Sequence, residues 1–290
     1  MADVASANAV AHGARNRDHI VDVLIAERAP RLTGSPAWPL LRPPIYQLLG
    51  YKRARAMAEA IAPMSGEAAL DHVADLLDVR VEVSGLDHLP PKGRLVIVCN
   101  HPTGIADGVA VYDALRPVRP DLIFFANSDA LRVAPRFGET LIPVEWVEAK
   151  RTRERTRDTL QRSKAAFEAE RALMIFPAGR LARRKAGVLT DPPWQSSAMS
   201  LARKYEAPVV PMHLTGPWSF LFHFFDRFSQ ELRDITLFHE LLNKRGQSFR
   251  LIVGPAIPCS DLPAEAPEAS AAVKHYVERI LPASPERPFR

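Results

Sequence analysis

The chain has 290 residues, of which 47% are apolar, and a formal charge of +5. This length and apolar content suffice for one large domain with a substantial core. The charge favours anionic partners, but no zinc-finger spacing, helix-turn-helix pattern or aromatic RNA-binding signature occurs, so we expect no nucleic-acid partner. Two cysteines argue against a disulfide framework, and no apolar run approaches the ~18 residues of a transmembrane helix.

The first 78 residues are predicted to form an N-terminal arm and a helical extension. Residues 1–40 are expected to be a loosely ordered arm with one short helix near Arg17–Glu27. A turn-rich link up to Pro44 follows, because its prolines argue against a continuous helix. Helical patterns cover Ile45–Ala62 and Gly66–Leu77. The first is basic and amphipathic, so it either lies on a membrane surface or packs against its own domain.

Residues 79–260 alternate between short apolar strands and helices. This alternation predicts an α/β domain with a mostly parallel or mixed central sheet flanked by helices. Residues 261–290 are predicted to form a C-terminal helix, Glu268–Ile280, and a tail. The predicted strands are Val79–Val83, Leu95–Cys99, Leu122–Phe125, Thr140–Val144, Ala172–Phe176, Val209–Met212 and Phe249–Val253. The predicted helices between them are about Gly108–Leu115, Thr152–Glu168 and Ser196–Tyr205.

A histidine and a carboxylate, His101 and Asp107, come directly after the apolar strand Leu95–Cys99. In open α/β sheets, ligands bind at the carboxyl ends of the strands. A carboxylate can fix the tautomer of a neighbouring imidazole and stabilise its protonated form, so this pair can build a general base. Because no Gly-x-Ser-x-Gly motif is present, the hydroxyl to be activated most simply belongs to the substrate. Cys99 and Ser128 are weaker candidates for a nucleophile, and we expect no metal site.

A second motif, Phe176-Pro177-Ala178-Gly179-Arg180, also follows an apolar strand. Gly179 permits close approach of a ligand to the backbone, and Arg180 offers a planar fork for phosphate oxygens. Arg183, Arg184 and Lys185 follow at once. This basic cluster either binds phosphate or is a solvated run.

At these two motifs the chain resembles the glycerolipid and lysophospholipid acyltransferase superfamily, of the lysophosphatidic acid acyltransferase type. The similarity covers about Val79 to Pro258 and includes Val209-Val210-Pro211-Met212, which resembles the family's late Val-Pro strand. Two features depart from the usual pattern: five residues separate His101 from Asp107, and Ala178 replaces a glutamate. Both features are similar to the hemolysin-like and ornithine-lipid-related branch. The family's Gly-Arg block lacks its arginine here, so that substrate contact is either supplied by Arg132 or Arg136 or absent.

The resemblance implies an O-acyltransferase without a bound cofactor. Acyl-CoA or an acyl carrier protein would donate a fatty acyl group to the hydroxyl of a lysolipid, with His101 as the base, Asp107 as its orienting partner and no acyl-enzyme. Backbone N–H groups near Gly104 or Gly179 are candidate oxyanion donors, and Trp218–Phe225 is one candidate trough for the acyl chain. The expected substrate-binding residues are Asn100, Gly104, Gly179, Arg180, Arg183 and Arg184.

The resemblance also bears on where the protein acts. A lysolipid acceptor and a basic chain together imply a cytoplasmic protein that associates peripherally with the anionic inner face of the membrane. The alternative is a catalytically degenerate member of the same fold that binds lipid or membrane without turnover.

Overall fold

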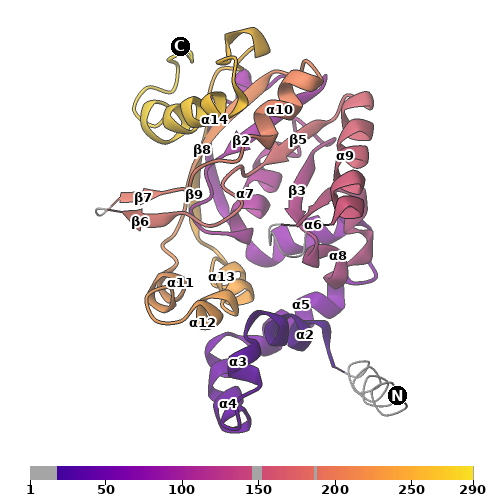
Figure 1. Cartoon of the computed structure of the whole chain (residues 1–290), viewed down its shortest axis with the longest axis vertical. Coiled ribbons are helices and arrows are strands. Elements are labelled where there is room, and N and C mark those ends of the chain that lie inside the picture. Colours follow the sequence, from indigo (N-terminus) through magenta and orange to yellow (C-terminus); the bar gives the residue numbers. More distant parts are fainter. Residues whose placement is uncertain (1–17, 146–151, 186–187, 290) are drawn as a thin grey trace.

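A central sheet of seven strands in the order β1-β9-β8-β2-β5-β3-β4 organises the computed structural model (Figure 1). The structure describes residues 18–145, 152–185 and 188–289, so the predicted arm before residue 18 lies outside the described residues. Strands β2, β3, β4, β5 and β8 run parallel to one another. Strand β9 pairs with β8 in the antiparallel direction, and β1 pairs with β9 in parallel. The predicted mixed α/β fold is confirmed. The strands are β1 Arg80–Ser84, β2 Leu95–Cys99, β3 Ile123–Asn127, β4 Leu141–Val144, β5 Ala172–Ile175, β8 Val209–Thr215 and β9 Ser248–Val253.

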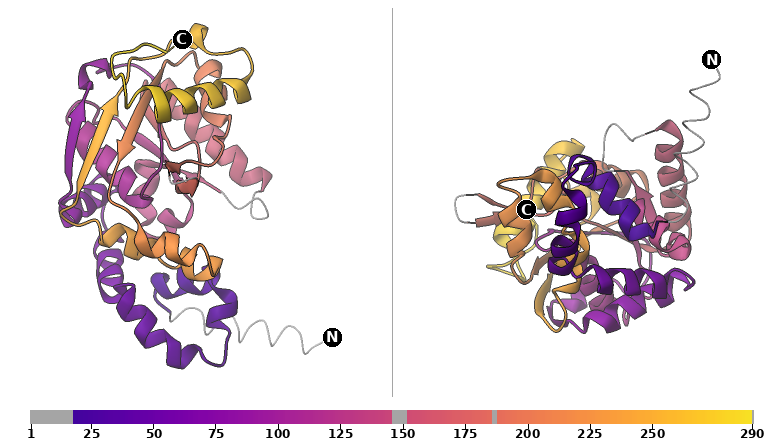
Figure 2. Two further views of the ribbon diagram at one scale, coloured as in Figure 1. Left: turned by 90° about the vertical axis from the view of Figure 1, so that its left-hand side faces the viewer. Right: turned by 90° about the horizontal axis from the view of Figure 1, so that it is seen from below.

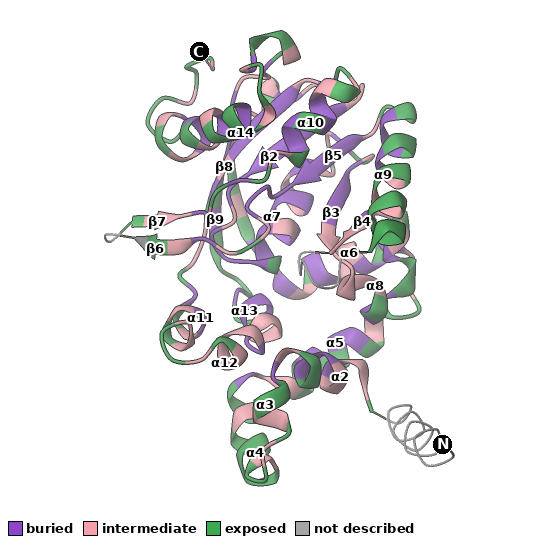
Figure 3. Cartoon of the chain, viewed as in Figure 1, coloured by how far each residue is buried: buried purple, intermediate pink, exposed green. Residues whose placement is uncertain are grey.

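Strand β2 shows why the sheet is covered on both faces. All five of its residues are buried; Leu95, Ile97 and Cys99 join one core cluster, and Val96 and Val98 join the other. Successive side chains of a strand point to opposite faces, so an unbroken apolar run needs helices on both sides. Figure 3 shows the central strands buried along their length. The flanking helices are α7 Ile105–Leu115, α9 Arg153–Glu168, α10 Ser197–Lys204 and α14 Ala266–His275, which continues as a π-helix over Tyr276–Ile280.

The N-terminal extension contains more helix than predicted. Two short helices, α3 Pro30–Thr33 and α4 Trp38–Leu48, cover most of the expected link, and Pro43 and Pro44 lie inside α4. The single helix predicted over residues 45–62 is instead divided at Gly50. This residue has a left-handed backbone conformation, with a φ of 66°, and it separates α4 from α5 Tyr51–Ile61. Helix α6, Gly66–Leu77, has its predicted ends, and Ser65 Oγ accepts the Ala68 N–H at 3.2 Å. Helix α2 covers Ile20–Arg28.

The apolar face of α5 packs inside the protein. Its residues Ala54, Met57, Ala58 and Ile61 are buried, in the same core cluster as the helices α2, α6 and α7. Of the two alternatives for this basic helix, the structure therefore shows packing against its own domain. Within the described ranges, no helix has both the length and the apolar character needed to cross a bilayer.

Several short elements were not predicted from the sequence. A two-stranded antiparallel hairpin, β6 Arg183–Lys185 and β7 Val188–Thr190, projects from the sheet (Figure 1). Helices α11 Phe220–Phe225, α12 Gln230–Asp234 and α13 Leu237–Leu242 lie at the same end of the molecule as α2–α5, opposite the C-terminus (Figures 1 and 2). Helix α8 covers Asp129–Val133.

Candidate active site

The structure brings the two predicted motifs together at the carboxyl edge of the sheet. His101 follows β2 after one intervening residue, and Phe176 directly follows the neighbouring strand β5. Their rings stack with centroids 4.5 Å apart and an interplanar angle of 29°. This contact fixes one face of the imidazole.

Asp107 lies beside the imidazole at the start of α7. The helix begins at Ile105, earlier than predicted, so Asp107 is in its first turn and is fully buried. Its Oδ2 atom lies 2.9 Å from Nδ1 of His101, although the alignment of the two groups falls short of a hydrogen bond. Oδ2 accepts the N–H groups of Thr103 and Gly104, at 2.8 and 3.0 Å, and Oδ1 accepts the Thr103 hydroxyl. A carboxylate is also stabilised by the positive end of a helix.

The two glycines of the motifs shape the turns, but their N–H groups are already used. Gly104 has a φ of 93°, and a Cβ there would lie 3.2 Å from the Leu181 side chain, so only glycine fits without strain. The Gly104 N–H donates to Asp107, and the Gly179 N–H donates to the Phe176 carbonyl at 3.0 Å. These two N–H groups are therefore not free to act as oxyanion donors, and a role for other N–H groups near the two glycines stays a prediction.

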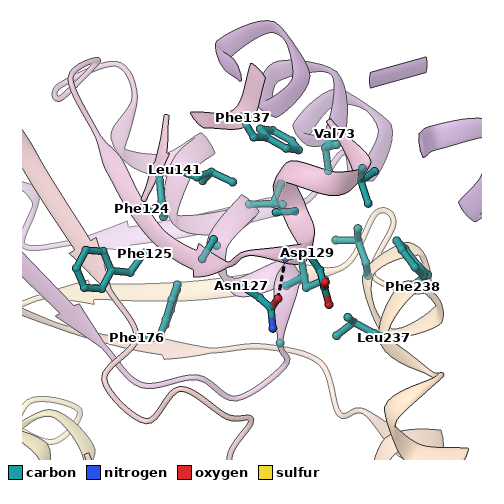
Figure 4. Close-up of a pocket in the computed structure, with 18 of the residues that line it drawn as sticks. Val73, Phe124, Phe125, Asn127, Asp129, Phe137, Leu141, Phe176, Leu237 and Phe238 are labelled. Atoms are coloured by element: carbon teal, nitrogen blue, oxygen red, sulfur yellow. Dashed lines mark hydrogen bonds between the residues drawn. The ribbon is translucent and has the colours of Figure 1, made fainter. Parts of the chain in front are cut away.

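A cavity of about 330 Å³ opens beside His101 (Figure 4). It lies between the sheet edge and helices from the N-terminal extension, and most of its lining is apolar. Val73, Phe124, Phe137, Leu141, Leu237 and Phe238 are among the apolar lining residues. Its polar lining residues include Arg180 and an ion pair in which Arg28 Nη2 lies 2.8 Å from Asp129 Oδ2. The residues His101, Gly104, Gly179 and Arg180 all line this cavity.

The basic residues predicted at the site lie in different surroundings. Arg180 is exposed and has no hydrogen-bond or ion-pair partner among the described residues. Arg183 lies outside the cavity lining and donates to both carboxylate oxygens of Asp226, at 2.9 and 3.1 Å. Arg184 lies over the Trp218 ring at 5.4 Å and does not line the cavity either. The side chain of Lys185 lies outside the described part of the chain.

Asn100 lies behind His101, away from the cavity lining. Its side-chain amide donates to the Leu214 carbonyl at 2.8 Å and accepts the Leu214 N–H at 2.7 Å. The Asn100 side chain thus forms two hydrogen bonds with the β8 main chain, in the place where main-chain pairing of β2 with β8 has ended. The structure thus gives Asn100 a role in fixing the end of β2, and a contact with substrate stays a prediction.

The other sequence candidates are engaged elsewhere. Burial raises the pKa of the Cys99 thiol well above its ordinary value, so the nucleophilic thiolate is disfavoured. Neither Cys99 nor Ser128 lines the cavity. Arg132 is paired with Glu27 and Asp129, and Arg136 with Glu139. Trp218–Phe225 is also absent from the cavity lining, and its role as a trough for an acyl chain stays a prediction.

The sequence reasoning missed Asp191 and Trp194. Asp191 is 3% exposed, and its carboxylate accepts the main-chain N–H of His101 at 3.1 Å and the Trp194 indole N–H at 2.8 Å. Burial is the main cause that raises the pKa of Asp191 to about 6, against the opposing effect of these hydrogen bonds. No local pattern marks an Asp-Pro-Pro-Trp segment as part of a site 90 residues away.

The raised pKa of Asp191 predicts a pH-dependent stability. The folded protein binds this proton more tightly than the unfolded chain, so stability falls as pH rises from about 4 to about 6. We expect the wild type to lose about 3 kcal/mol relative to Asp191→Asn over this interval. Urea denaturation at pH 4 and pH 7 measures the difference; parallel stability profiles for the two proteins would contradict it.

Comparisons with known proteins show which enzymes the chain resembles. The Acyltransferase family model matches residues 80–215, from β1 through β8. The chain is similar to lyso-glycine lipid O-acyltransferases from Phocaeicola vulgatus, with 28% identity over 195 residues (65% of this chain, 68% of the relative), and from Bacteroides thetaiotaomicron, with 27% identity over 195 residues (65% and 70%). Over the strands β1 to β8 the chain thus resembles acyltransferases of lysolipids.

Among solved structures, the crystal structure of the 1-acyl-sn-glycerophosphate (LPA) acyltransferase PlsC from Thermotoga maritima matches with a TM-score of 0.49. The two proteins are 13% identical, and the match covers 78% of this chain and 83% of that chain.

Proposed function

We propose that this protein transfers a fatty acyl group from an acyl thioester to the hydroxyl of a lysolipid at the His101 cavity. One observation carries the proposal: an imidazole lies at an apolar cavity, with its Nδ1 atom 2.9 Å from a fully buried carboxylate. Since Nδ1 faces Asp107, Nε2 on the opposite side of the ring is the nitrogen available to a substrate.

In the proposed reaction, His101 acts as a general base on the acceptor. Nε2 takes the hydroxyl proton as the acceptor oxygen attacks the thioester carbonyl carbon and forms the new C–O bond. Collapse of the tetrahedral intermediate breaks the C–S bond, and the imidazolium returns the proton to the leaving thiolate. Asp107 stabilises the imidazolium during this cycle. No enzyme nucleophile is needed, in keeping with the buried position of Cys99.

Arg180 is the residue we assign to anionic groups at the cavity mouth. Its exposed guanidinium lines the cavity and is free of protein partners among the described residues. It can bind phosphate of the donor's carrier group, or an anionic group of the acceptor, with two parallel N–H donors. With the Gly104 and Gly179 N–H groups occupied, Arg180 is also a candidate to stabilise the tetrahedral oxyanion.

The similar proteins suggest the acceptor class. Both relatives are lyso-glycine lipid O-acyltransferases, so the proposed acceptor is a lysolipid with a glycine or another amino-acid head group. The test is an incubation of purified protein with palmitoyl-CoA and a panel that contains lyso-glycine lipid, lyso-ornithine lipid and lysophosphatidic acid. Thiol release with acylated lipid as product supports the proposal. Binding of these lipids without turnover would instead favour the degenerate lipid-binding alternative.

The proposed membrane-facing surface combines α4 with α11 and the turn after it. Leu40 on α4 is 79% exposed, and Phe220 and Phe228 are 64% and 72% exposed. Glu231 of α12 accepts the N–H groups of Arg31 and Leu32 of α3, which joins the helix that follows α11 to the helix that precedes α4. Residues 30–62 contain five basic residues and one acidic residue. Exposed aromatic and aliphatic groups near positive charge suit an anionic lipid surface.

A flotation assay tests this surface. Phe220→Ser, Phe224→Ser and Phe228→Ser together are expected to reduce flotation with anionic phospholipid vesicles by at least about tenfold, because apolar burial in the interface is lost. Leu160→Ser on α9, where Leu160 is 49% exposed, is the matched control and should float like the wild type. Equal flotation of the triple variant and the wild type would contradict the proposal that this surface binds the membrane.

A further inference from the structure

A second buried carboxylate, Asp191, holds the main chain of His101. The residue follows β7 and is 3% exposed. Each oxygen has its own donor: Oδ1 accepts the His101 N–H at 3.1 Å, and Oδ2 accepts the Trp194 indole N–H at 2.8 Å. The Asp191 N–H in turn donates to Glu278 Oε1 at 2.7 Å, which connects the segment to the C-terminal helix. The hydrogen bonds with Trp194 and Glu278 therefore hold Asp191 in place independently of its contact with His101.

The main chain of His101 needs this support because β2 has already ended. Cys99 is the last residue of β2 in register with a neighbouring strand, opposite Met212. Beyond it, the His101 carbonyl accepts the Ala182 N–H at 2.8 Å, and the His101 N–H donates to Asp191. Both partners belong to the segments that flank the β6–β7 hairpin. The residues next to the hairpin thus supply the main-chain hydrogen bonds of His101 that a neighbouring strand would otherwise supply.

We propose that Asp191 is a positioning residue for acyl transfer, which acts by fixing the backbone that carries the His101 base. The inference rests on the proposed function. Asp107 and Phe176 fix the orientation of the imidazole ring. The position of the ring also depends on the position of the His101 main chain that carries it. A displacement of about 1 Å at a catalytic group can lower the rate about 10²-fold. The loss should fall on kcat, because Asp191 does not line the cavity that holds the substrate.

The kinetic test compares Asp191→Ala with Asp191→Asn. Alanine removes the acceptor of the His101 N–H, so we expect kcat to fall about 10²-fold while KM stays within about threefold. Asparagine keeps an oxygen for the His101 N–H and loses the bond to Trp194, so we expect it to restore kcat to within about tenfold of the wild type. Wild-type kcat in Asp191→Ala, or equal losses in both variants, would overturn the proposal.

Asp121→Ala is the matched control. Asp121 also accepts a main-chain N–H of the sheet, that of Ala172 at 3.1 Å, but at the amino end of β5. Its loss should lower stability and leave kcat within about twofold of the wild type. A fall in kcat equal to that of Asp191→Ala would show that general loosening of the sheet explains both effects, and would overturn the positioning role.

A second readout does not depend on turnover. In protein labelled with ¹⁵N-histidine, the His101 amide signal is identified by its absence from His101→Ala. At pH 8 the wild-type amide proton should resonate downfield, because it donates to a carboxylate, and it should move upfield in Asp191→Ala and less so in Asp191→Asn. An unmoved His101 signal in Asp191→Ala would overturn the proposal. If no acceptor is acylated but the signal moves, the proposed function fails while the contact with His101 stands.

Discussion

Replacement of His101 by alanine is expected to lower kcat about 10²- to 10⁴-fold, the usual contribution of a positioned general base. The imidazole is the only titratable group that both lines the cavity and contacts a fully buried carboxylate within the described residues. Without it, the acceptor hydroxyl must lose its proton to water. Initial rates of thiol release with palmitoyl-CoA and a lysolipid measure the effect, and urea denaturation should confirm that the variant is folded.

His275→Ala is the control for this variant. His275 is exposed on α14, outside the cavity lining, so its loss should leave kcat within about twofold of the wild type. Turnover at the wild-type rate in His101→Ala would contradict the assignment of the base.

Val73→Phe is expected to shift the preferred acyl chain towards shorter lengths. Val73 is buried on α6, lines the cavity and lies on the side of it away from Phe176 (Figure 4). A larger ring there would displace the end of a long chain. Loss of burial for about three methylenes, at ~0.8 kcal/mol each, corresponds to roughly a 50-fold decrease. We therefore expect kcat/KM to fall by about that factor for palmitoyl-CoA and to change little for octanoyl-CoA.

Val273→Phe separates this effect from strain. Val273 is fully buried on α14 but belongs to the core cluster on the other face of the sheet. Its replacement should lower stability through overpacking and leave the ratio of kcat/KM for the two donors unchanged. An unchanged ratio in Val73→Phe as well would place the acyl chain outside this cavity.

The fold could be predicted largely because its strands are buried on both faces. Runs such as Leu95–Cys99 have an apolar character that depends only on local sequence, and β2 has its predicted ends. The N-terminal extension was harder. Pro43 and Pro44 indicated a link, but they lie inside α4, beyond its first turn. Trp38, Ile45 and Tyr46 of α4 are only partly buried against the core, and the segment is helical although its local sequence argues against it.

The residues of the site also differ in how far local sequence predicts them. His101, Asp107 and Arg180 could be proposed because each lies in the short segment that follows a predicted apolar strand. Asp191 could not, because its role comes from the β6–β7 hairpin that returns the chain to β2, and neither short strand has a hydrophobic period. The cavity could not be predicted for a related reason. Its walls come from α6, β3 and α13, which are brought together only by the fold, whereas the aromatic run at Trp218–Phe225 was conspicuous in sequence.

The account's central claim is that the cavity beside His101 holds the acyl chain of the donor during transfer. A crystal structure of the full chain with a non-hydrolysable palmitoyl-CoA analogue tests it most directly. We predict that the acyl chain lies along Phe124, Val73 and Phe137, with the carbonyl beside His101 and the carrier phosphates towards Arg180. An acyl chain bound along the exposed α11 aromatics, with the cavity left unoccupied, would contradict the account.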